Sequence, residues 1–385
     1  MRTITTTDDL ARFCEAAKAQ PYVTIDTEFL RERTYYSKLC LIQMALPGKE
    51  GDAVLVDPLA GDGLSLDPLY DLFRHEATVK VFHAARQDLE IFFVEGKTFP
   101  RPLFDTQVAA MVCGFGEQVG YETLVKKIAR ENLDKSSRFT DWSRRPLSAA
   151  QQTYALADVT HLRVIYEHLA KELKRTGRQK WVEEEIAILL DPETYITRPE
   201  EAWQKVRTRT NSGRFMALVR ELARFREEYA QTRDVPRARV FKDDALLELA
   251  STRPTTLEEL GRSRLLMREG RKADIAEGIL AAVKAGMEMK PEDFPKVDGS
   301  REQLQVNTAL ADLLRVLLKA KSEEAGVAPK LIAATSELDA LSAGERDLPM
   351  LHGWRHEVFG ADALRLCRGE IALSAIGGAV QVVVI

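Results

Sequence analysis

Two carboxylates separated by one residue end an apolar stretch near the start of the chain. Asp26 and Glu28 follow residues 22–25, a run rich in β-branched residues that is typical of a buried strand. Alternate residues of a strand point to the same side of a sheet, so both carboxylates can face one cation. Chance alone produces about nine acid-x-acid pairs in a chain of this composition. The position is more informative, because two carboxylates at the end of an apolar strand are costly without a compensating positive charge.

Two further carboxylates are expected at the starts of helices. Asp88 follows the strand-like residues 79–85 and falls in the first turn of the next helix, where the helix dipole favours a negative charge. The same position is equally typical of a residue that only stabilises the helix end. Asp105 also precedes a helical stretch, and we interpret it as an N-cap.

A longer helix carries the remaining candidates. Ser148 and Gln151 have the spacing of a capping box, which predicts a helix that continues to about residue 174. Tyr154 and Asp158 are four residues apart and therefore share one face of that helix. A Tyr–Asp pair at this spacing is often only a surface hydrogen bond. Here the neighbouring residues are apolar, so an inward-facing Asp158 would require a partner.

Together these residues indicate a metal-dependent reaction. Four carboxylates without a Cys or His cluster suit hard cations such as Mg²⁺ or Mn²⁺. Two such ions can activate water and stabilise the leaving oxygen at a phosphorus centre, which favours phosphodiester hydrolysis. The sequence has no GxxxxGK[ST], GxGxxG or GxSxG motif, so nucleotide-motor, dinucleotide-binding and serine-hydrolase functions lack their usual markers.

The elements that position these residues change in type near residue 200. Before it, strand-like runs at 22–26, 39–46, 53–58 and 79–85 alternate with helical stretches, which predicts an α/β domain whose first three strands form an antiparallel meander. After residue 207 helical patterns dominate until 380–385, with a Pro- and Gly-containing break at 290–300. We therefore expect an α/β domain at 1–204, a helical domain at 205–290, a linker at 291–302 and a second helical domain at 303–385.

Composition describes an ordinary globular chain. The 385 residues include 55 Lys and Arg and 59 Asp and Glu, and no window is apolar enough to span a membrane. The four cysteines are scattered, and the first residues lack the pattern of a secretory signal, so we expect a cytoplasmic protein. Residues 205–290 carry 19 basic against 13 acidic residues. This excess could attract a polyanion, although on charge alone a solvated helical surface is the favoured explanation.

Several motifs, taken in order, resemble those of the bacterial ribonuclease D family. They are DTEF at 26–29, HAARQDLEIF at 83–92, FDTQVAA at 104–110 and DWSRRPLSAAQQTYALADVTHL at 141–162. Members of this family are 3′→5′ exoribonucleases of the tyrosine subgroup of the four-acid superfamily. The resemblance implies a ribonuclease H-like exonuclease domain, with a mixed sheet flanked by helices, followed by two small all-α domains. The first of these looks like a helicase-and-ribonuclease-D C-terminal (HRDC) domain, and the second like a divergent copy of it.

The resemblance also implies roles for individual residues. Asp26, Glu28, Asp88 and Asp158 would hold two divalent metal ions, Mg²⁺ or Mn²⁺. Tyr154 would position the attacking water. Three further residues would contact the terminal nucleotide, with the aromatic ring of one of them stacking on its base: Thr27, Phe29 and His83.

The expected function follows from this resemblance. We expect an exoribonuclease that hydrolyses RNA from a free 3′ end to nucleoside 5′-monophosphates, with transfer-RNA precursors and other structured RNAs as substrates. The arginines of residues 205–290 would hold RNA phosphates. We expect a monomer. Two alternatives remain open at this stage: a DNA exonuclease built on the same catalytic domain, and a non-catalytic RNA-binding protein.

Overall fold

The computed structural model describes residues 2–48, 52–61, 63–134, 140–210, 212–296 and 305–385. Its chain divides into two compact units, which we describe separately. The first unit contains Met1–Phe29, Leu39–Thr194 and Leu304–Ile385, and the second contains Leu30–Lys38 and Tyr195–Gln303. Of the predicted linker at 291–302, residues 297–302 lie outside the described part. The domain boundaries of the sequence analysis remain predictions.

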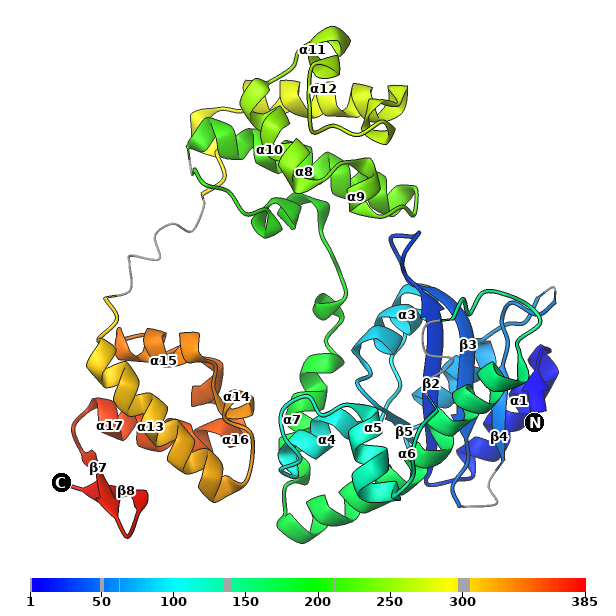
Figure 1. The fold of residues 1–385 in the computed structure, drawn as a ribbon, viewed down its shortest axis with the longest axis vertical. Helices are drawn as coiled ribbons and strands as arrows, with labels where there is room; N and C mark the ends of the chain where they lie inside the picture. Colours follow the sequence, from blue (N-terminus) through cyan, green and yellow to red (C-terminus); the bar gives the residue numbers. More distant parts are fainter. Residues whose placement is uncertain (1, 49–51, 62, 135–139, 211, 297–304) are drawn as a thin grey trace. The chain divides into compact units, whose positions relative to one another are not determined.

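A six-stranded mixed sheet forms the centre of the first unit (Figure 1). Its order is β1-β4-β3-β2-β5-β6, with β3 antiparallel to β4 and with β5 parallel to both β2 and β6. The strands are β1 (Arg2–Ile4), β2 (Tyr22–Leu30), β3 (Lys38–Ala45), β4 (Ala53–Val56), β5 (Val79–Phe82) and β6 (Leu103–Asp105). The four strand-like runs predicted from the sequence all lie in this sheet. Except for Lys38, every residue of β3 is buried, as expected of a central strand covered on both faces.

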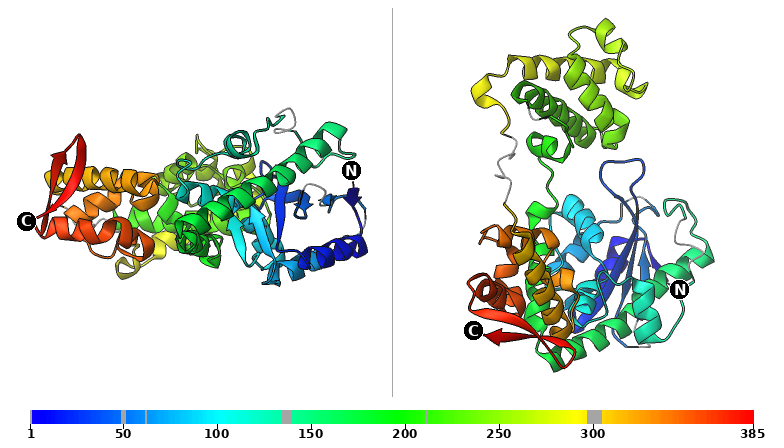
Figure 2. Two further views of the ribbon diagram at one scale, coloured as in Figure 1. Left: turned by 90° about the horizontal axis from the view of Figure 1, so that it is seen from below. Right: turned by 60° about the vertical axis from the view of Figure 1, so that its left-hand side comes forward.

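Helices cover both faces of the sheet. Figure 2 (left) shows α6 on one side and α1 on the other. The helices of this part are α1 (Thr7–Lys18), α2 (Asp67–Arg74), α3 (Arg86–Gly96), α4 (Thr106–Val112), α5 (Tyr121–Leu124), the π-helix η1 (Val125–Ala129), α6 (Ala149–Thr176), α7 (Gln179–Leu189) and η2 (Pro192–Thr194). The capping box of Ser148 and Gln151 is confirmed, and Gly177 ends α6 in the left-handed conformation. Asp105 is confirmed as the N-cap of α4.

The end of the chain adds a helical module to the first unit. Its elements are α13 (Thr308–Ala325), α14 (Pro329–Ile332), α15 (Thr335–Ser342), η6 (Pro349–Leu351), α16 (Gly353–Arg355), η7 (His356–Gly360), α17 (Ala361–Cys367), β7 (Ile371–Ile376) and β8 (Ala379–Val384). The rings of Trp354 and Trp181 stack with centroids 4.7 Å apart, and the indole N–H of Trp354 donates to Glu185 at 2.8 Å. These contacts attach the module to α7.

The last two strands correct one expectation. The module was expected to be all-helical, but β7 and β8 form an antiparallel hairpin. Residues 380–385 were predicted to be strand-like, but β7 was not predicted. The sequence of β7, IALSAI, has no strict alternation of apolar and polar side chains.

The second unit is helical. Its elements are η3 (Pro199–Lys205), α8 (Gly213–Thr232), α9 (Arg237–Val240), α10 (Asp243–Thr252), α11 (Leu257–Gly261), η4 (Glu269–Arg271), α12 (Ala273–Glu288) and η5 (Pro291–Asp293). Leu218, Leu222, Leu246 and Ile279 are fully buried in its core. Among the described residues of the whole chain, no helix is both long and apolar enough to cross a membrane.

Several arginines expected to hold RNA phosphates have structural contacts instead. Arg214 donates to the carbonyls of Gly286 and Met289 at 3.0 and 2.7 Å. Arg226 is buried and donates to Asp243 at 2.7 Å. The guanidinium of Arg237 pairs with Glu227. The positive charge of this unit is therefore partly neutralised by its own packing.

Candidate active site

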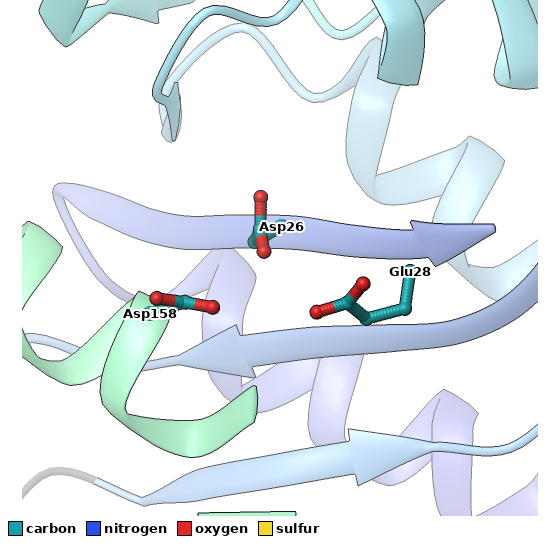
Figure 3. Close-up of side chains that lie close together, drawn as sticks. All are labelled: Asp26, Glu28 and Asp158. Atoms are coloured by element: carbon teal, nitrogen blue, oxygen red, sulfur yellow. The ribbon is translucent and has the colours of Figure 1, made fainter. Parts of the chain in front are cut away.

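Three carboxylates from two elements converge beside β2, which continues to Leu30 and does not end at Asp26 and Glu28 as expected from the sequence. Asp26 and Glu28 lie on β2, and Asp158 lies on α6 (Figure 3). One ligand oxygen from each of the three lies within 4.8 Å of the others. The two-residue spacing on the strand thus brings its pair together as predicted, and the helix contributes the third carboxylate from 130 residues later in the chain.

The carboxylates of this cluster can all be ionised near neutral pH only if a positive charge lies beside them. Burial, and then repulsion from Asp26, Asp158 and Asp88, raises the pKa of Glu28 to about 10. Burial and the charge of Asp158 raise the pKa of Asp26 as well. Like charges that are buried together cannot all be ionised without compensation. Oxygen-only ligands of this kind suit Mg²⁺ or Mn²⁺, so the residues fit a divalent cation.

Asp88 stands apart from this group of three. It lies in the first turn of α3, as predicted, and is buried. Burial and the charge of Asp26 raise its pKa. The hydroxyl of Thr27, itself buried, donates a hydrogen bond to its carboxylate. The Thr27 side chain therefore holds the Asp88 carboxylate through a buried hydrogen bond.

Two aromatic contacts fix the part of α6 that carries Tyr154 and Asp158. The hydroxyl of Tyr121, on α5, donates to the backbone carbonyls of Asp158 and Ala157, the latter at 3.3 Å. The ring of Trp142 lies with its centroid 6.1 Å from that of Tyr154. Tyr121 was not predicted as a site residue, because nothing in the residues around it indicates a contact with Asp158, 37 residues later in the chain.

Arg145 fixes the segment that leads into α6. Its guanidinium forms a two-pronged ion pair with the buried carboxylate of Asp57, with both N–O distances at 2.6 Å. The same group donates to the carbonyls of Trp142 and Cys40, each at 2.7 Å. Paired hydrogen bonds of this geometry restrict orientation as well as distance. This segment therefore places Trp142 beside Tyr154.

A cavity of about 570 Å³ opens over the carboxylates. Its volume is within the usual range for small-molecule sites. The walls include all but one of the site residues predicted from the sequence, together with the tyrosine that was not predicted: Asp26, Thr27, Glu28, Phe29, His83, Tyr121, Tyr154 and Asp158. Asp88 is buried and is not among the residues that line the cavity.

Comparisons with known proteins agree with this arrangement. The family model described as a 3′-5′ exonuclease matches residues 1–174, and the HRDC domain model matches residues 215–283. The chain is 64% identical over 382 residues to ribonuclease D of Jannaschia sp. (strain CCS1), covering 99% of each chain. It is 47% identical to ribonuclease D of Granulibacter bethesdensis, covering 99% of this chain and 96% of that protein.

A solved structure shows the same fold. The crystal structure of Escherichia coli RNase D, "an exoribonuclease involved in structured RNA processing", superposes with a TM-score of 0.82 at 29% identity. The match covers 96% of this chain and 98% of that one. These matches confirm the predicted architecture. It consists of an α/β exonuclease domain followed by a helical C-terminal region that contains an HRDC domain.

The fold and the carboxylate cluster define a divalent-metal-dependent 3′→5′ exonuclease. The sequence similarity extends over the whole chain and not only over this domain. The chain belongs to the ribonuclease D family, and it is a hydrolytic 3′→5′ exoribonuclease.

Proposed function

We propose that this exoribonuclease trims the 3′ ends of transfer-RNA precursors and other structured RNAs and releases nucleoside 5′-monophosphates. The observation that carries the proposal is the cluster of Asp26, Glu28 and Asp158 at the base of a cavity large enough for one nucleotide. The similarity to E. coli RNase D, an exoribonuclease involved in structured RNA processing, supports this substrate class. We further propose that the protein acts as a cytoplasmic monomer.

Two divalent ions, Mg²⁺ or Mn²⁺, complete this site in our proposal. Asp26, Glu28 and Asp158 would hold one, and Asp26 and Asp88 would hold the other, with Asp88 partly acting through water. When bound, such ions lower the pKa of water and neutralise charge on the leaving oxygen. The raised pKa values of Glu28 and Asp26 support this assignment, because these carboxylates need a cation to be ionised near neutral pH.

We assign the orientation of the attacking water to Tyr154. Of the two tyrosines that border the cavity, Tyr121 donates its hydroxyl proton to the backbone of α6. The Tyr121 proton therefore serves this contact. Tyr154 lies on the same helix face as Asp158. A phenol is a poor base at neutral pH because its ordinary pKa is about 10, so Tyr154 would orient water by hydrogen bonding.

We assign the terminal nucleotide to the remaining walls of the cavity. Phe29 would stack on the base, an interaction that every base can make. His83 and the backbone of Thr27 would contact the sugar. All three residues border the cavity, and the Thr27 hydroxyl is already engaged by Asp88.

The test is digestion of a transfer-RNA precursor that carries a 3′ trailer. We expect Mg²⁺-dependent shortening that ends near the mature 3′ end and yields 5′-monophosphates. Asp26→Asn should still bind the precursor but not shorten it. Asp8→Asn is the matched control, because Asp8 is exposed on α1 and loses the same charge far from the cluster. Shortening by Asp26→Asn at the wild-type rate would overturn the metal assignment.

A further inference from the structure

The turn that carries His83 is held in an unusual conformation. Ala84, which follows it, has a φ of 54°, in the left-handed region that residues other than glycine rarely occupy. The carboxylate of Asp105 accepts hydrogen bonds from the amides of Ala84 and Ala85 at 3.1 and 2.8 Å. The same carboxylate caps α4. His83 is thereby fixed at the wall of the active-site cavity.

Hydrogen bonding determines which nitrogen of His83 carries the proton. Its Nδ1 lies 3.0 Å from the hydroxyl oxygen of Thr106. That hydroxyl donates to the carbonyl of Phe82, also at 3.0 Å. A hydroxyl has one proton and a carbonyl can only accept, so Nδ1 must be the donor to Thr106. Thr106 is fully buried, where leaving one of these groups without a partner would be costly.

The second ring nitrogen of His83 is therefore an acceptor. Burial lowers the pKa of His83, although the charge of Asp105 opposes this effect, so the ring is neutral near pH 7. Within the described part of the chain, Nε2 has no hydrogen-bond partner. The Tyr121 ring, whose centroid lies 5.3 Å from that of His83, does not supply one, because its hydroxyl donates to α6.

An uncharged acceptor at this place restricts what it can recognise. Phosphate oxygens accept hydrogen bonds and do not donate, so they cannot pair with Nε2. The edges of the four bases offer donors at different positions, so a fixed acceptor would suit some bases and not others. The 2′-hydroxyl is a donor present in every ribonucleotide and absent from DNA.

We propose that Nε2 of His83 accepts a hydrogen bond from the 2′-hydroxyl of the terminal ribose, and that His83 thereby selects RNA over DNA at the 3′ end. This inference rests on the proposed function. It assigns the preference for RNA to His83, an acceptor that is uncharged, unlike the carboxylates, and whose tautomer is fixed by Thr106.

The experiment compares 5′-labelled oligoribonucleotides that differ only in the last sugar, which is ribose, 2′-deoxyribose or 3′-deoxyribose. The measured quantity is kcat/KM for removal of that nucleotide by the full-length protein with Mg²⁺. We expect the wild type to prefer the ribose terminus over the 2′-deoxy terminus roughly five- to tenfold, the value of one neutral hydrogen bond. This preference should exceed any preference of ribose over 3′-deoxyribose.

Two variants test the assignment to one nitrogen. In His83→Asn the amide can replace the Nδ1 donor, but nothing replaces Nε2, so the 2′-dependent preference should fall to about one. In His83→Gln the amide oxygen can reach the position of Nε2, so part of the preference should return. Melting temperatures within a few degrees of the wild type will show that both variants are folded, and the ratio of the two rates within each variant, rather than either rate alone, is the test.

Three results would overturn the assignment. They are equal wild-type rates on the ribose and 2′-deoxy termini, a full preference retained by His83→Asn, and a loss of preference that follows the 3′-hydroxyl. A wild-type protein that removes none of the three termini would instead overturn the proposed function itself, so the two failures are distinguishable.

Discussion

The phenol of Tyr121, on α5, donates a hydrogen bond to the backbone carbonyl of Asp158, on α6. This contact links a short helix of the cavity wall to the residue that brings the third carboxylate to the cluster. Tyr121 is partly buried, and desolvation, followed by the charges of Asp158 and Asp26, raises its pKa. The phenol therefore keeps its proton at neutral pH and remains a donor to α6.

Tyr121→Phe should weaken metal binding more than it weakens the fold. The variant keeps the ring and loses one hydrogen bond, worth about 1 kcal/mol. We expect the Mg²⁺ concentration for half-maximal activity to rise about fivefold, with a melting temperature within a few degrees of the wild type. Tyr166→Phe is the control, because it removes a phenol from α6 that is not part of the cavity wall. An unchanged Mg²⁺ requirement in Tyr121→Phe would contradict the positioning role.

Glu28→Gln should abolish activity and stabilise the metal-free protein. Because the pKa of Glu28 is raised to about 10, the folded state binds a proton that the unfolded state has released above about pH 4.5. The wild type therefore loses stability relative to the variant as the pH rises from about 5 to about 8. Urea unfolding in chelator at about pH 6 and pH 8 should show the difference widening, and activity should fall about 1000-fold. A gap that stays constant between these two pH values would show that Glu28 is already ionised without metal.

Metal binding should release protons. Glu28 and Asp26 have raised pKa values without metal, and a carboxylate must be deprotonated to bind a cation. Calorimetric titration with Mg²⁺ at about pH 7.5, in two buffers of different ionisation enthalpy, should give a release of about one proton or more. The apparent affinity should rise with pH. Binding heats that do not depend on the buffer would argue against this prediction.

Lys80, on β5, should add a second pH dependence to the stability. Its side chain is fully buried on β5 and its ammonium group donates to the carbonyl of His75 at 2.6 Å. Desolvation lowers its pKa to about 8. Between about pH 8 and pH 10.5 the unfolded state binds more protons than the folded state, so the wild type gains stability relative to Lys80→Met as the pH rises. Unfolding midpoints measured at about pH 7.5 and pH 9.5 check the direction, and a constant difference would contradict it.

Features encoded by neighbouring residues were predictable from the sequence. The alternation of a strand places Asp26 and Glu28 on one side, and the capping box of Ser148 with Gln151 sets the start of α6. Asp105 was predicted as an N-cap for the same reason. Each of these depends on residues at most three positions apart, whose geometry the backbone fixes locally.

Features that depend on tertiary packing were not predictable. The Tyr121 phenol meets α6 only after both helices have packed. Arg226 was expected to face RNA, but it is buried against Asp243, because a count of charges does not show which of them the fold pairs internally. The same limit applies to the hairpin of β7 and β8, since strand pairing is settled by the partner as much as by local propensity.

The most direct test of the account is digestion of a 5′-labelled oligoribonucleotide and its DNA counterpart, each with a free 3′-hydroxyl, by the wild type and by Asp26→Asn. We predict that the wild type shortens RNA from the 3′ end in the presence of Mg²⁺ or Mn²⁺. Chelator and Asp26→Asn should each abolish this digestion, and DNA should be digested much more weakly. Equal digestion of DNA would contradict the assignment of RNA as the substrate, and digestion of RNA in chelator would contradict the role of the carboxylate cluster.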